Sequence, residues 1–480
     1  MLTLKYSYLL PKTTVGRGKD KKEVPSVIHV GRVKSCVLSM ITQKEREIAA
    51  FTETKFYKIA DNFLEGDGSG IEAIWKNGET SSYFGNKNIY DNEGFLSYDE
   101  ANKFAQMLNQ NGKTKIINLE KKTERKEPPL LYNLAEAQAE ATKRYKLSPA
   151  RTLEVIQSLY EKKMVTYPRT DARVISSAVA KEITKNIKPL NKLSGYAEMV
   201  NEIIDKEKYK FLSRTKYVND KKITDHYAII PTGQKVELFK ELSDVEKKIY
   251  LMIVNRFLQI FFGSATYESY SVTAETLGER FYSKAKELTD VGWMIVEGIP
   301  DKIQEANKKA NRLKKLQQNN TYDARFIIKE GKTQPPKRYT SGSLILAMEN
   351  AGQFIEDEEL RAQIKGSGIG TSATRAQIIE NLVKNGQIMI NSKTQIVTPT
   401  FMGEIIYEII SFSIPSLLSC EFTASWERGL EMVAEGKLSK ENFKLKFDKS
   451  VEQNTNNVKI NDVSDIIKHN LKIIKMRYIN

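Results

Sequence analysis

Strand-like patterns lie on both sides of a long helical stretch, and this succession is the strongest constraint on the fold. The region from Phe56 to about Lys122 and the region from Tyr267 to Glu297 show alternating apolar and polar residues with glycine-rich turns. Residues 133–263 carry helical patterns instead. We therefore predict a β-rich unit whose strands lie on both sides of an inserted helical domain. The charged residues 121–129, which end in two prolines, are interpreted as a linker at a domain boundary.

The composition is typical of a basic, folded protein with several domains. Its 480 residues suffice for about three domains of the usual size. The formal net charge of +15 predicts an anionic partner, with nucleic acid as the leading candidate and a merely basic protein as the alternative. Cys36 and Cys420 are the only cysteines, which excludes a disulfide framework and a Cys-rich zinc site and fits a reducing cytoplasm. The most apolar segment, residues 249–262, also contains charged and polar residues, so it is predicted to be a buried core helix and not a membrane span.

The C-terminal third is predicted to contain a helix followed by a hairpin. Ser341 or Ser343 begins one helix, and a glycine-rich turn at residues 366–371 leads into a second helix over residues 373–384. A hairpin over residues 388–397 follows. This layout is frequent in nucleic-acid-binding proteins, although many such units only pack. The Asn- and Lys-rich end of the chain gives no structural prediction.

Tyr167 is the candidate nucleophile. A helix predicted over residues 149–163 and a short apolar pair lead to Tyr167 in a turn that Pro168 fixes. A phenol is a weak nucleophile at its free pKa of about 10, so it needs cationic or hydrogen-bonding neighbours. Arg169 can bind phosphate oxygens in a bidentate manner, and Thr170 adds a hydroxyl donor. Because the chain contains 22 tyrosines, an ordinary surface turn is the alternative interpretation.

Two further polar segments can serve phosphate chemistry. The segment from Asp225 to Thr232 includes His226, which is either a hydrogen-bonding or proton-handling residue or a structural histidine. Residues 30–35 open a predicted helix that runs to about Ala50, and this start is either a phosphate-binding place or an ordinary capped helix. The sequence contains no metal-type His/Cys cluster, serine hydrolase elbow, kinase signature or P-loop. Phosphodiester chemistry through a tyrosine is therefore the leading hypothesis.

Six segments resemble, in family order, the motifs of the type IA DNA topoisomerases, and most of all those of topoisomerase III. They are residues 30–35, 166–171, 225–232, 331–339, 368–375 and 422–427. Two departures are mild, since Lys34 replaces the usual glutamine and Tyr227 replaces a second histidine. Six ordered motifs are highly specific, so we expect a topoisomerase III-like chain.

The resemblance implies a role for each matching residue. Tyr167 would attack one DNA strand and hold its five-prime phosphate covalently, Arg169 would stabilise the scissile phosphate, and His226 would contact DNA phosphate or assist proton handling. DNA-binding residues are implied at Gly31, Arg32, Val33, Lys34, Ser35, Thr170, Asp171, Thr371, Thr374 and Arg375. The expected partner is DNA, mainly as single-stranded segments, in a cytoplasm that contains nucleoid or plasmid DNA.

The resemblance also implies a multi-domain α+β fold, with a toroidal core that opens as a gate for a second strand. Its expected parts are a groove domain (residues 1–55 and 333–445), a β-rich arch (residues 56–130 and 266–332), a helical domain with Tyr167 (residues 131–265) and a tail (residues 446–480).

The family normally begins with a Toprim domain that holds an acidic Mg²⁺ site, and no such domain precedes Gly31 here. Mg²⁺ is the cofactor expected for the family, but its ligands are missing from this sequence, so we predict no metal site. Without the metal, turnover should be crippled. One hypothesis is therefore a topoisomerase whose Toprim half is supplied by a separate Toprim-containing polypeptide or was lost when the chain was defined. The alternative is a catalytically inactive remnant that binds single-stranded DNA.

Overall fold

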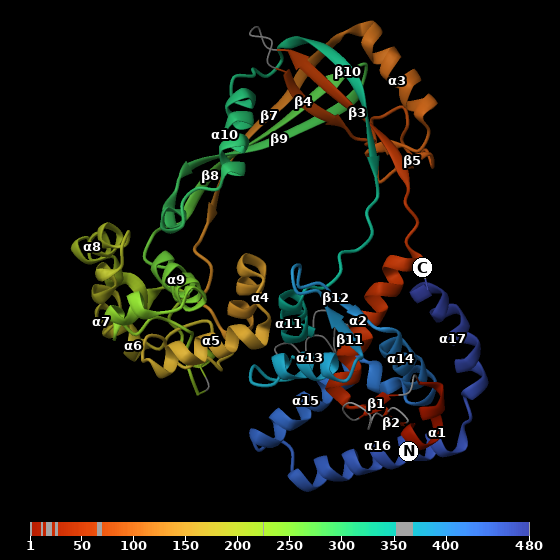
Figure 1. The fold of residues 1–480 in the computed structure, drawn as a ribbon. Helices are drawn as coiled ribbons and strands as arrows, with labels where there is room; N and C mark the ends of the chain where they lie inside the picture. The colour runs from red at the N-terminus through yellow and green to blue at the C-terminus, as the bar shows by residue number, and fades with distance from the viewer. Residues whose placement is uncertain are drawn as a thin grey trace.

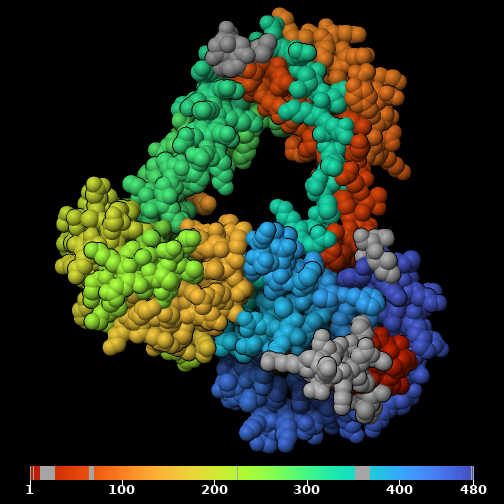
Figure 2. Space-filling view, viewed as in Figure 1, coloured from red at the N-terminus to blue at the C-terminus, as the bar shows by residue number. Residues whose placement is uncertain are grey.

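The chain forms a ring of three lobes around an opening in the computed structural model (Figures 1 and 2). The structure describes residues 2–10, 13–15, 22–24, 27–64, 70–223, 225–351 and 368–479. Each lobe has its own cluster of buried hydrophobic side chains. An arch lobe lies on one side of the opening, and a helical lobe and a base lobe meet on the other. The domain bounds given above stay a prediction, which the three separate clusters support.

A closed antiparallel barrel forms the arch lobe. The lobe contains β3 (Lys55–Leu64), β4 (Gly70–Trp75), β5 (Ile89–Tyr90), β6 (Gly94–Phe95), α3 (Tyr98–Asn111), β7 (Lys113–Lys126), β8 (Ala265–Thr276), β9 (Glu279–Asp290), α10 (Asp301–Leu313) and β10 (Thr321–Lys332). The strands follow the order β10, β7, β8, β9, β4 and β3, and β3 pairs again with β10, which closes the sheet. Phe104 of α3 and Leu313 of α10 belong to the buried cluster of the barrel. Closure leaves these six strands without a free edge.

Strand β7 is longer than the sequence predicted. Residues 121–126, which we interpreted as part of a linker, continue the strand and pair with residues 265–270 of β8. This pairing shows that the linker interpretation is wrong. No strand was predicted here because this end of β7 is largely exposed on both faces and shows no apolar alternation. Ion pairs replace apolar contacts there: Lys121 pairs with Glu268 on the adjacent strand β8, and Glu124 pairs with Lys286 of β9 across β8. The connection from the arch to the helical lobe is therefore a paired ribbon.

Asp61 is a charged residue buried inside the barrel. It lies on β3, opposite Ala73 of β4 and Phe326 of β10, and it is fully buried. Among the described residues, neither of its carboxylate oxygens has a hydrogen-bond partner. Burial raises the pKa of the Asp61 carboxyl to about 7, and the nearby Thr114 hydroxyl opposes this shift.

We expect Asp61 to make the chain less stable as the pH rises. The folded-state pKa of about 7 lies above the ordinary aspartate value of 3.8, so between these values the folded state binds more protons than the unfolded state. The stabilising contribution of Asp61 to the free energy of unfolding is thus fully present below about pH 4, and it is lost as the pH rises through about 7. The difference of about three units corresponds to an upper bound of about 4 kcal/mol, and we expect roughly half of it after relaxation of the barrel.

Urea-induced unfolding at several pH values tests this expectation. Asp61→Asn should flatten the fall in unfolding free energy between about pH 5 and pH 8. Asp323→Asn, at an exposed position on β10, is the matched control and should leave the fall unchanged. A pH dependence that is the same in Asp61→Asn and in the unsubstituted chain would contradict the assignment.

The helical lobe packs around one buried helix. It contains α4 (Leu134–Tyr145), α5 (Pro149–Glu161), α6 (Ser177–Lys181), α7 (Thr184–Ile187), α8 (Ala197–Asp205) and α9 (Asp244–Gln259), joined in part by the 3-10 helices η3 (Lys188–Lys192), η4 (Lys208–Arg214), η5 (Asp220–Lys222) and η6 (Val236–Glu241). The prediction of a core helix is confirmed, since Ile253 and Phe257 of α9 are completely buried. Ser243 and Glu246 form a capping box that begins this helix. Among the described residues, we find no helix with the length and hydrophobicity of a membrane span.

The base lobe is built from both ends of the chain. It contains α1 (Leu2–Tyr6), η1 (Ser7–Leu9), β1 (Thr13–Val15), β2 (Lys22–Val24), α2 (Arg32–Ala50), α11 (Ser341–Glu349), α13 (Arg375–Lys384), β11 (Ile388–Ile390), β12 (Val397–Pro399), α14 (Phe401–Ser413), η9 (Pro415–Leu418), α15 (Cys420–Ala434), α16 (Lys440–Ile460) and α17 (Ser464–Ile479). The predicted helix–hairpin unit is present as α13 followed by β11 and β12, while residues 366–367 of the glycine-rich turn lie outside the described residues.

Two details of the base lobe differ from the sequence predictions. Helix α11 is capped by Thr340 and not by Ser341 or Ser343, because the extended Thr340 accepts a hydrogen bond from the Ser343 amide. The region from residue 446, predicted as a tail, continues α16 and forms α17, and it contributes Val458 and Ile467 to the buried cluster of the lobe. Polar composition hid these helices because most of their surface faces solvent.

The helical lobe meets the base lobe along α4 and α11, and we call this contact the α4–α11 junction. Ala135 of α4 belongs to the buried cluster of the base lobe. A Cβ atom at Gly342 of α11 would lie 2.9 Å from the Ala139 Cα atom and 2.7 Å from the Thr142 Cβ atom. The missing side chain at Gly342 thus allows the two helices to approach closely.

Gly342→Ala is expected to loosen the α4–α11 junction. Overpacking of this kind costs about 1–3 kcal/mol, and the higher helix propensity of alanine offsets about 1 kcal/mol of it. Hydrogen exchange at the amides of α4 and α11 should accelerate together. Gly78→Ala is the control, because a Cβ atom there meets no atom within 4 Å. Unchanged exchange in Gly342→Ala would show that the junction tolerates the methyl group.

Candidate active site

Tyr167 lies on a short segment that packs between α5 and the segment around residue 230. Helix α5 is capped by the side chain of Ser148, begins at Pro149 and ends at Glu161. Val165 then bridges to Pro231, the Thr166 amide donates to the Ile230 carbonyl over 3.0 Å, and the Thr166 hydroxyl donates to the Ala228 carbonyl over 2.9 Å. Two of the six sequence motifs, separated by about sixty residues, are thus joined by backbone hydrogen bonds.

The side chains of Tyr167 and His226 are in contact. Their ring centroids are 4.4 Å apart, and the ring of Tyr160 lies edge-on to Tyr167 at 5.4 Å. These three residues line an open cavity of about 610 Å³. Its other lining residues are Glu161, Lys163, Val165, Thr166, Tyr227, Thr232 and Gln234. The half-buried Tyr167 therefore borders a space large enough for part of a nucleotide chain.

Tyr227 is another tyrosine that lines this cavity. Burial raises the pKa of Tyr227 above its ordinary value, which makes this side chain a poorer source of phenolate. The arrangement therefore favours Tyr167, which lies against the imidazole of His226, as the reacting tyrosine.

Thr170 and Arg169, which are neighbours in the sequence, face different surroundings. Thr170 is buried, and its hydroxyl donates to the His226 carbonyl over 2.9 Å while it accepts from the Ala172 amide over 3.1 Å. Thr170 thus fixes the backbone of His226 relative to the Tyr167 turn. Arg169 is exposed and has no hydrogen bond or ion pair to another described residue. Its guanidinium is therefore available to an anionic ligand, and its contact with a scissile phosphate stays a prediction.

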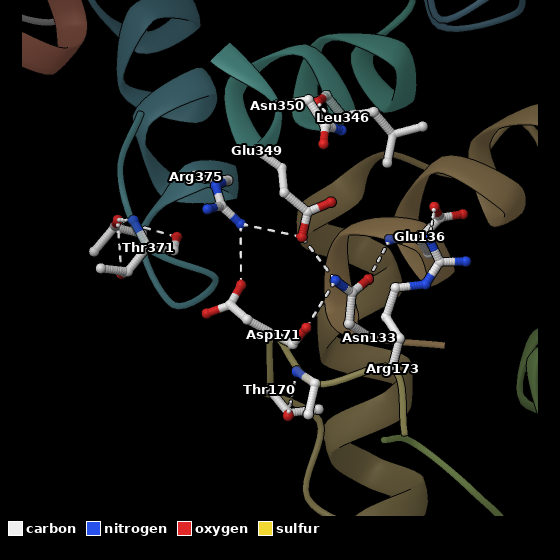
Figure 3. A network of polar contacts seen from close by, with 12 residues as sticks. Asn133, Glu136, Thr170, Asp171, Arg173, Leu346, Glu349, Asn350, Thr371 and Arg375 are labelled. Atoms are coloured by element: carbon white, nitrogen blue, oxygen red, sulfur yellow. Dashed lines mark hydrogen bonds and ion pairs between the residues drawn. The ribbon is translucent and has the colours of Figure 1, made fainter. Parts of the chain in front are cut away.

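Asp171 and Arg375 come together across the α4–α11 junction, as Figure 3 shows. The Arg375 Nη1 atom lies 3.3 Å from Asp171 Oδ1 and 3.8 Å from Glu349 Oε1. Asn133 completes the network, because its Nδ2 atom donates to Glu349 Oε1 over 2.7 Å and to the Asp171 carbonyl over 3.3 Å. Asp171 and Asn133 belong to the helical lobe, and Glu349 and Arg375 belong to the base lobe. We call these four residues the junction network.

The junction network contains one largely buried pair. The side chain of Arg375 is 6% exposed and that of Glu349 is 18% exposed, whereas that of Asp171 is 60% exposed. Burial raises the pKa of Glu349, and the charge of Arg375 and the bond from Asn133 oppose this shift. Arg375 was predicted to bind DNA, but in this closed ring its guanidinium is turned toward the junction. Its contact with DNA stays a prediction.

The start of α2 is held by contacts within the base lobe. Arg32 pairs with Glu427 over 2.5 Å, and Ser35 is buried with its hydroxyl accepting from the Gly31 amide over 3.3 Å. Val33 packs against the buried cluster of the lobe, and Lys34 is half-buried. The buried Ser35 hydroxyl is therefore turned toward the backbone at the helix start. The assignment of residues 31–35 to DNA binding stays a prediction.

Thr371 and Thr374 lie just before α13, beside the junction network. The Thr371 amide donates to the Thr374 hydroxyl over 3.0 Å, and both residues are exposed. Gly368 approaches closely, since a Cβ atom there would lie 2.8 Å from Arg375 Nη2 and 2.9 Å from the Glu349 carbonyl oxygen. The lack of a side chain at Gly368 thus leaves room for the Arg375–Glu349 pair.

The described residues do not fit a Mg²⁺ site. Among them, no group of three or more His, Cys, Asp or Glu side chains is close enough to hold a metal ion. Glu161, the carboxylate that lines the Tyr167 cavity, accepts a hydrogen bond from Gln157, and Asp171 pairs with Arg375. We therefore assign no step to a metal bound by these residues.

Sequence reasoning missed Tyr160, Asn133 and Glu349. Tyr160 is the penultimate residue of α5, and nothing in that helical pattern indicated a contact with Tyr167. Asn133 carried one usable signal, since it caps α4 and accepts from the Glu136 amide over 2.9 Å. Glu349 carried none, because its partners lie more than twenty residues away in the sequence or on the other lobe.

The comparisons with known proteins agree with this geometry. The family model described as DNA topoisomerase matches residues 9–444. The chain is 34% identical over 415 residues to DNA topoisomerase 3 of Bacillus subtilis, which covers 85% of this chain and 53% of the relative. It is 33% identical over 419 residues to DNA topoisomerase 3 of Bacillus licheniformis, with coverage of 86% and 54%. The chain thus spans about half the length of these curated relatives.

The fold is similar to that of a solved topoisomerase. Full-length topoisomerase I from Thermotoga maritima superposes with a TM-score of 0.62 at 21% identity, over 90% of this chain and 63% of that chain. The prediction of a multi-domain α+β toroid is confirmed by this likeness. The chain belongs to the DNA topoisomerase family, as a type IA member similar to topoisomerase 3.

Proposed function

We propose that this chain supplies the nucleophile and the ring of a topoisomerase that cuts one DNA strand and passes another. Tyr167 attacks a phosphodiester, its oxygen bonds to the five-prime phosphate, and the three-prime hydroxyl leaves. Attack by that hydroxyl on the phosphotyrosine reverses the step and reseals the strand. Energy is conserved in the covalent bond, so the cycle needs no nucleotide cofactor.

The position of Tyr167 beside the α4–α11 junction is the observation that carries the proposal. Asp171, four residues after the nucleophile, contacts Arg375 of the opposite lobe. A strand held on Tyr167 would therefore be cut where the two lobes separate. The central opening seen in Figure 2 would receive the passing strand once the junction opens.

Neighbouring residues supply the electrostatics of the proposed reaction. Arg169 would bind the non-bridging phosphate oxygens, on which charge develops in the transition state. His226 would hold or move the proton of the Tyr167 phenol, against which its ring lies. Thr170 would act as a positioning residue through the His226 backbone. The excess of basic residues, a net charge of +15, supports binding to DNA. The proposed DNA is mainly single-stranded and is the nucleoid or plasmid DNA of a cytoplasm.

Mg²⁺, which such phosphoryl chemistry uses to stabilise charge, would be held by a Toprim domain, supplied either by a separate Toprim-containing polypeptide or by a part of the protein outside this sequence. The test is therefore made with the chain and a labelled single-stranded oligonucleotide in Mg²⁺, with and without a Toprim-containing fragment of a topoisomerase 3 relative. After quenching with detergent and trypsin digestion, we expect DNA on the peptide of residues 164–169, which contains Tyr167. Salt-sensitive binding with no adduct under both conditions would identify an inactive DNA-binding remnant instead.

A further inference from the structure

The two cysteines of the chain are in contact inside the base lobe. Cys36 lies near the start of α2, and Cys420 is the first residue of α15. They are 384 residues apart in the sequence, which gave no reason to pair them, yet the Cys36 Sγ atom donates a hydrogen bond to the Cys420 Sγ atom over 3.0 Å. Both are free thiols. Neither side chain takes part in the proposed chemistry of Tyr167.

We propose that Cys36 and Cys420 form a reversible thiol–disulfide site that ties the start of α2 to the start of α15. A disulfide bond is about 2.05 Å long, so the two sulfur atoms need to approach by only about 1 Å. Other contacts already hold the helix starts together. The Thr423 hydroxyl donates to the Arg32 carbonyl over 3.3 Å, and Arg32 pairs with Glu427. The backbone therefore needs no large movement for the bond to form.

The two thiols differ in a way that sets the order of reaction. Cys36 is completely buried, whereas Cys420 is half-buried and is therefore the more accessible of the two thiols. The hydrogen bond from Cys36 lowers the pKa of Cys420, while that bond and burial raise the pKa of Cys36. Cys420 is thus the attacking thiolate, and Cys36 is the resolving thiol.

The oxidant is a low-molecular-weight disulfide, RSSR. The Cys420 thiolate attacks one sulfur of RSSR, which forms a mixed disulfide at Cys420 and releases one RS⁻. Cys36 then loses its proton, and its sulfur attacks the Cys420 sulfur, which releases a second RS⁻. Two protein thiols are oxidised and one RSSR is reduced to two RSH. The buried, less acidic Cys36 makes the second step the slower one.

Glutathione disulfide is the probe that tests the site. The reduced, folded chain is incubated with it, the remaining thiols are alkylated, and the chain is digested with trypsin. We expect a cross-link between the peptides of residues 35–44 and 394–428, which contain the two cysteines. The thermal unfolding midpoint should rise after oxidation and return after reduction with dithiothreitol, because the bond closes a very long loop of the unfolded chain.

Two substitutions separate a redox site from simple packing. Cys36→Ser should trap the mixed disulfide at Cys420 and lose the cross-link, and Cys420→Ser should leave Cys36 unreactive in the folded chain. The unsubstituted chain gives its own readout, so the test does not depend on how either variant folds. The proposal is overturned if the folded chain does not react, if it stops at a mixed disulfide on Cys420, or if it forms only cross-links between two chains.

Discussion

Tyr167→Phe is expected to abolish the covalent link between this chain and a cleaved DNA strand. The substitution removes one oxygen atom and keeps the ring, so the contacts with His226 at 4.4 Å and with Tyr160 at 5.4 Å remain. The cavity and the fold should therefore be unchanged. Because removal of a covalent nucleophile leaves only the binding contributions, we expect adduct formation to fall by roughly 10⁴-fold or more. A detergent-quenched gel with an end-labelled oligonucleotide measures it, under the Mg²⁺ and Toprim-fragment conditions given above.

Tyr160→Phe is the matched control. It removes a phenol oxygen from the same cavity and keeps the ring that lies against Tyr167. We expect it to retain adduct formation within roughly tenfold, since its ring and not its hydroxyl contacts the nucleophile. Both variants should bind single-stranded DNA with the salt dependence of the unsubstituted chain. An adduct that survives in Tyr167→Phe would assign the chemistry to another residue, with Tyr227 as the first to examine.

Arg375→Ala is expected to open the α4–α11 junction. The side chain of Asp171 is mostly exposed, so the Asp171–Arg375 pair contributes little to the stability of the junction. The Glu349 side is largely buried, and removal of its cationic partner leaves an uncompensated buried charge. Such a loss typically costs about 3–5 kcal/mol. Hydrogen exchange should accelerate at α4, α11 and the start of α13, while the closed barrel of the arch keeps its protection.

A second substitution and a change of pH separate charge from packing at this position. Glu349→Gln in the Arg375→Ala background should recover most of the lost stability, because no buried charge is then left unpaired. The cost of Arg375→Ala should also shrink as the pH falls. Burial already raises the pKa of Glu349, and without the opposing charge of Arg375 its protonation becomes easier still. A cost that is independent of pH and not reduced by Glu349→Gln would show that Arg375 acts through packing alone.

Sequence reasoning found the parts of the site whose signal is local. The helix that leads to Tyr167 and the positions of Arg169 and His226 follow from residues that are neighbours in the chain. The α2 start and the hairpin after α13 were recognised for the same reason. The order of the six motifs along the chain also carried the resemblance to the type IA topoisomerases. That resemblance predicted the ring-shaped fold, which hydrophobic periodicity alone does not predict.

Sequence reasoning did not predict the features that depend on contacts between distant segments. The pairing of residues 121–126 with β8 needs a partner 140 residues away, and its exposed charges resemble those of a linker. The junction network joins Asn133 and Asp171 to Glu349 and Arg375 across two lobes, and only the fold brings them together. The contact between Cys36 and Cys420 is of the same kind. These contacts depend on which side chains the fold brings together and buries. A few neighbouring residues in the sequence do not determine that.

The path of the backbone around the ring has a consequence for how long the ring can retain a DNA strand. The chain enters the helical lobe from β7 and leaves it into β8, and the base lobe is connected to the rest through β3 and β10. In the described part of the chain, the backbone therefore never crosses from α4 to α11, and the ring is closed there by contact alone. A closed circle of DNA can be threaded without breaking any peptide bond. Residence of DNA inside is then set by the lifetime of this one interface, so substitutions at Gly342 or Arg375 should change dwell time before they change affinity.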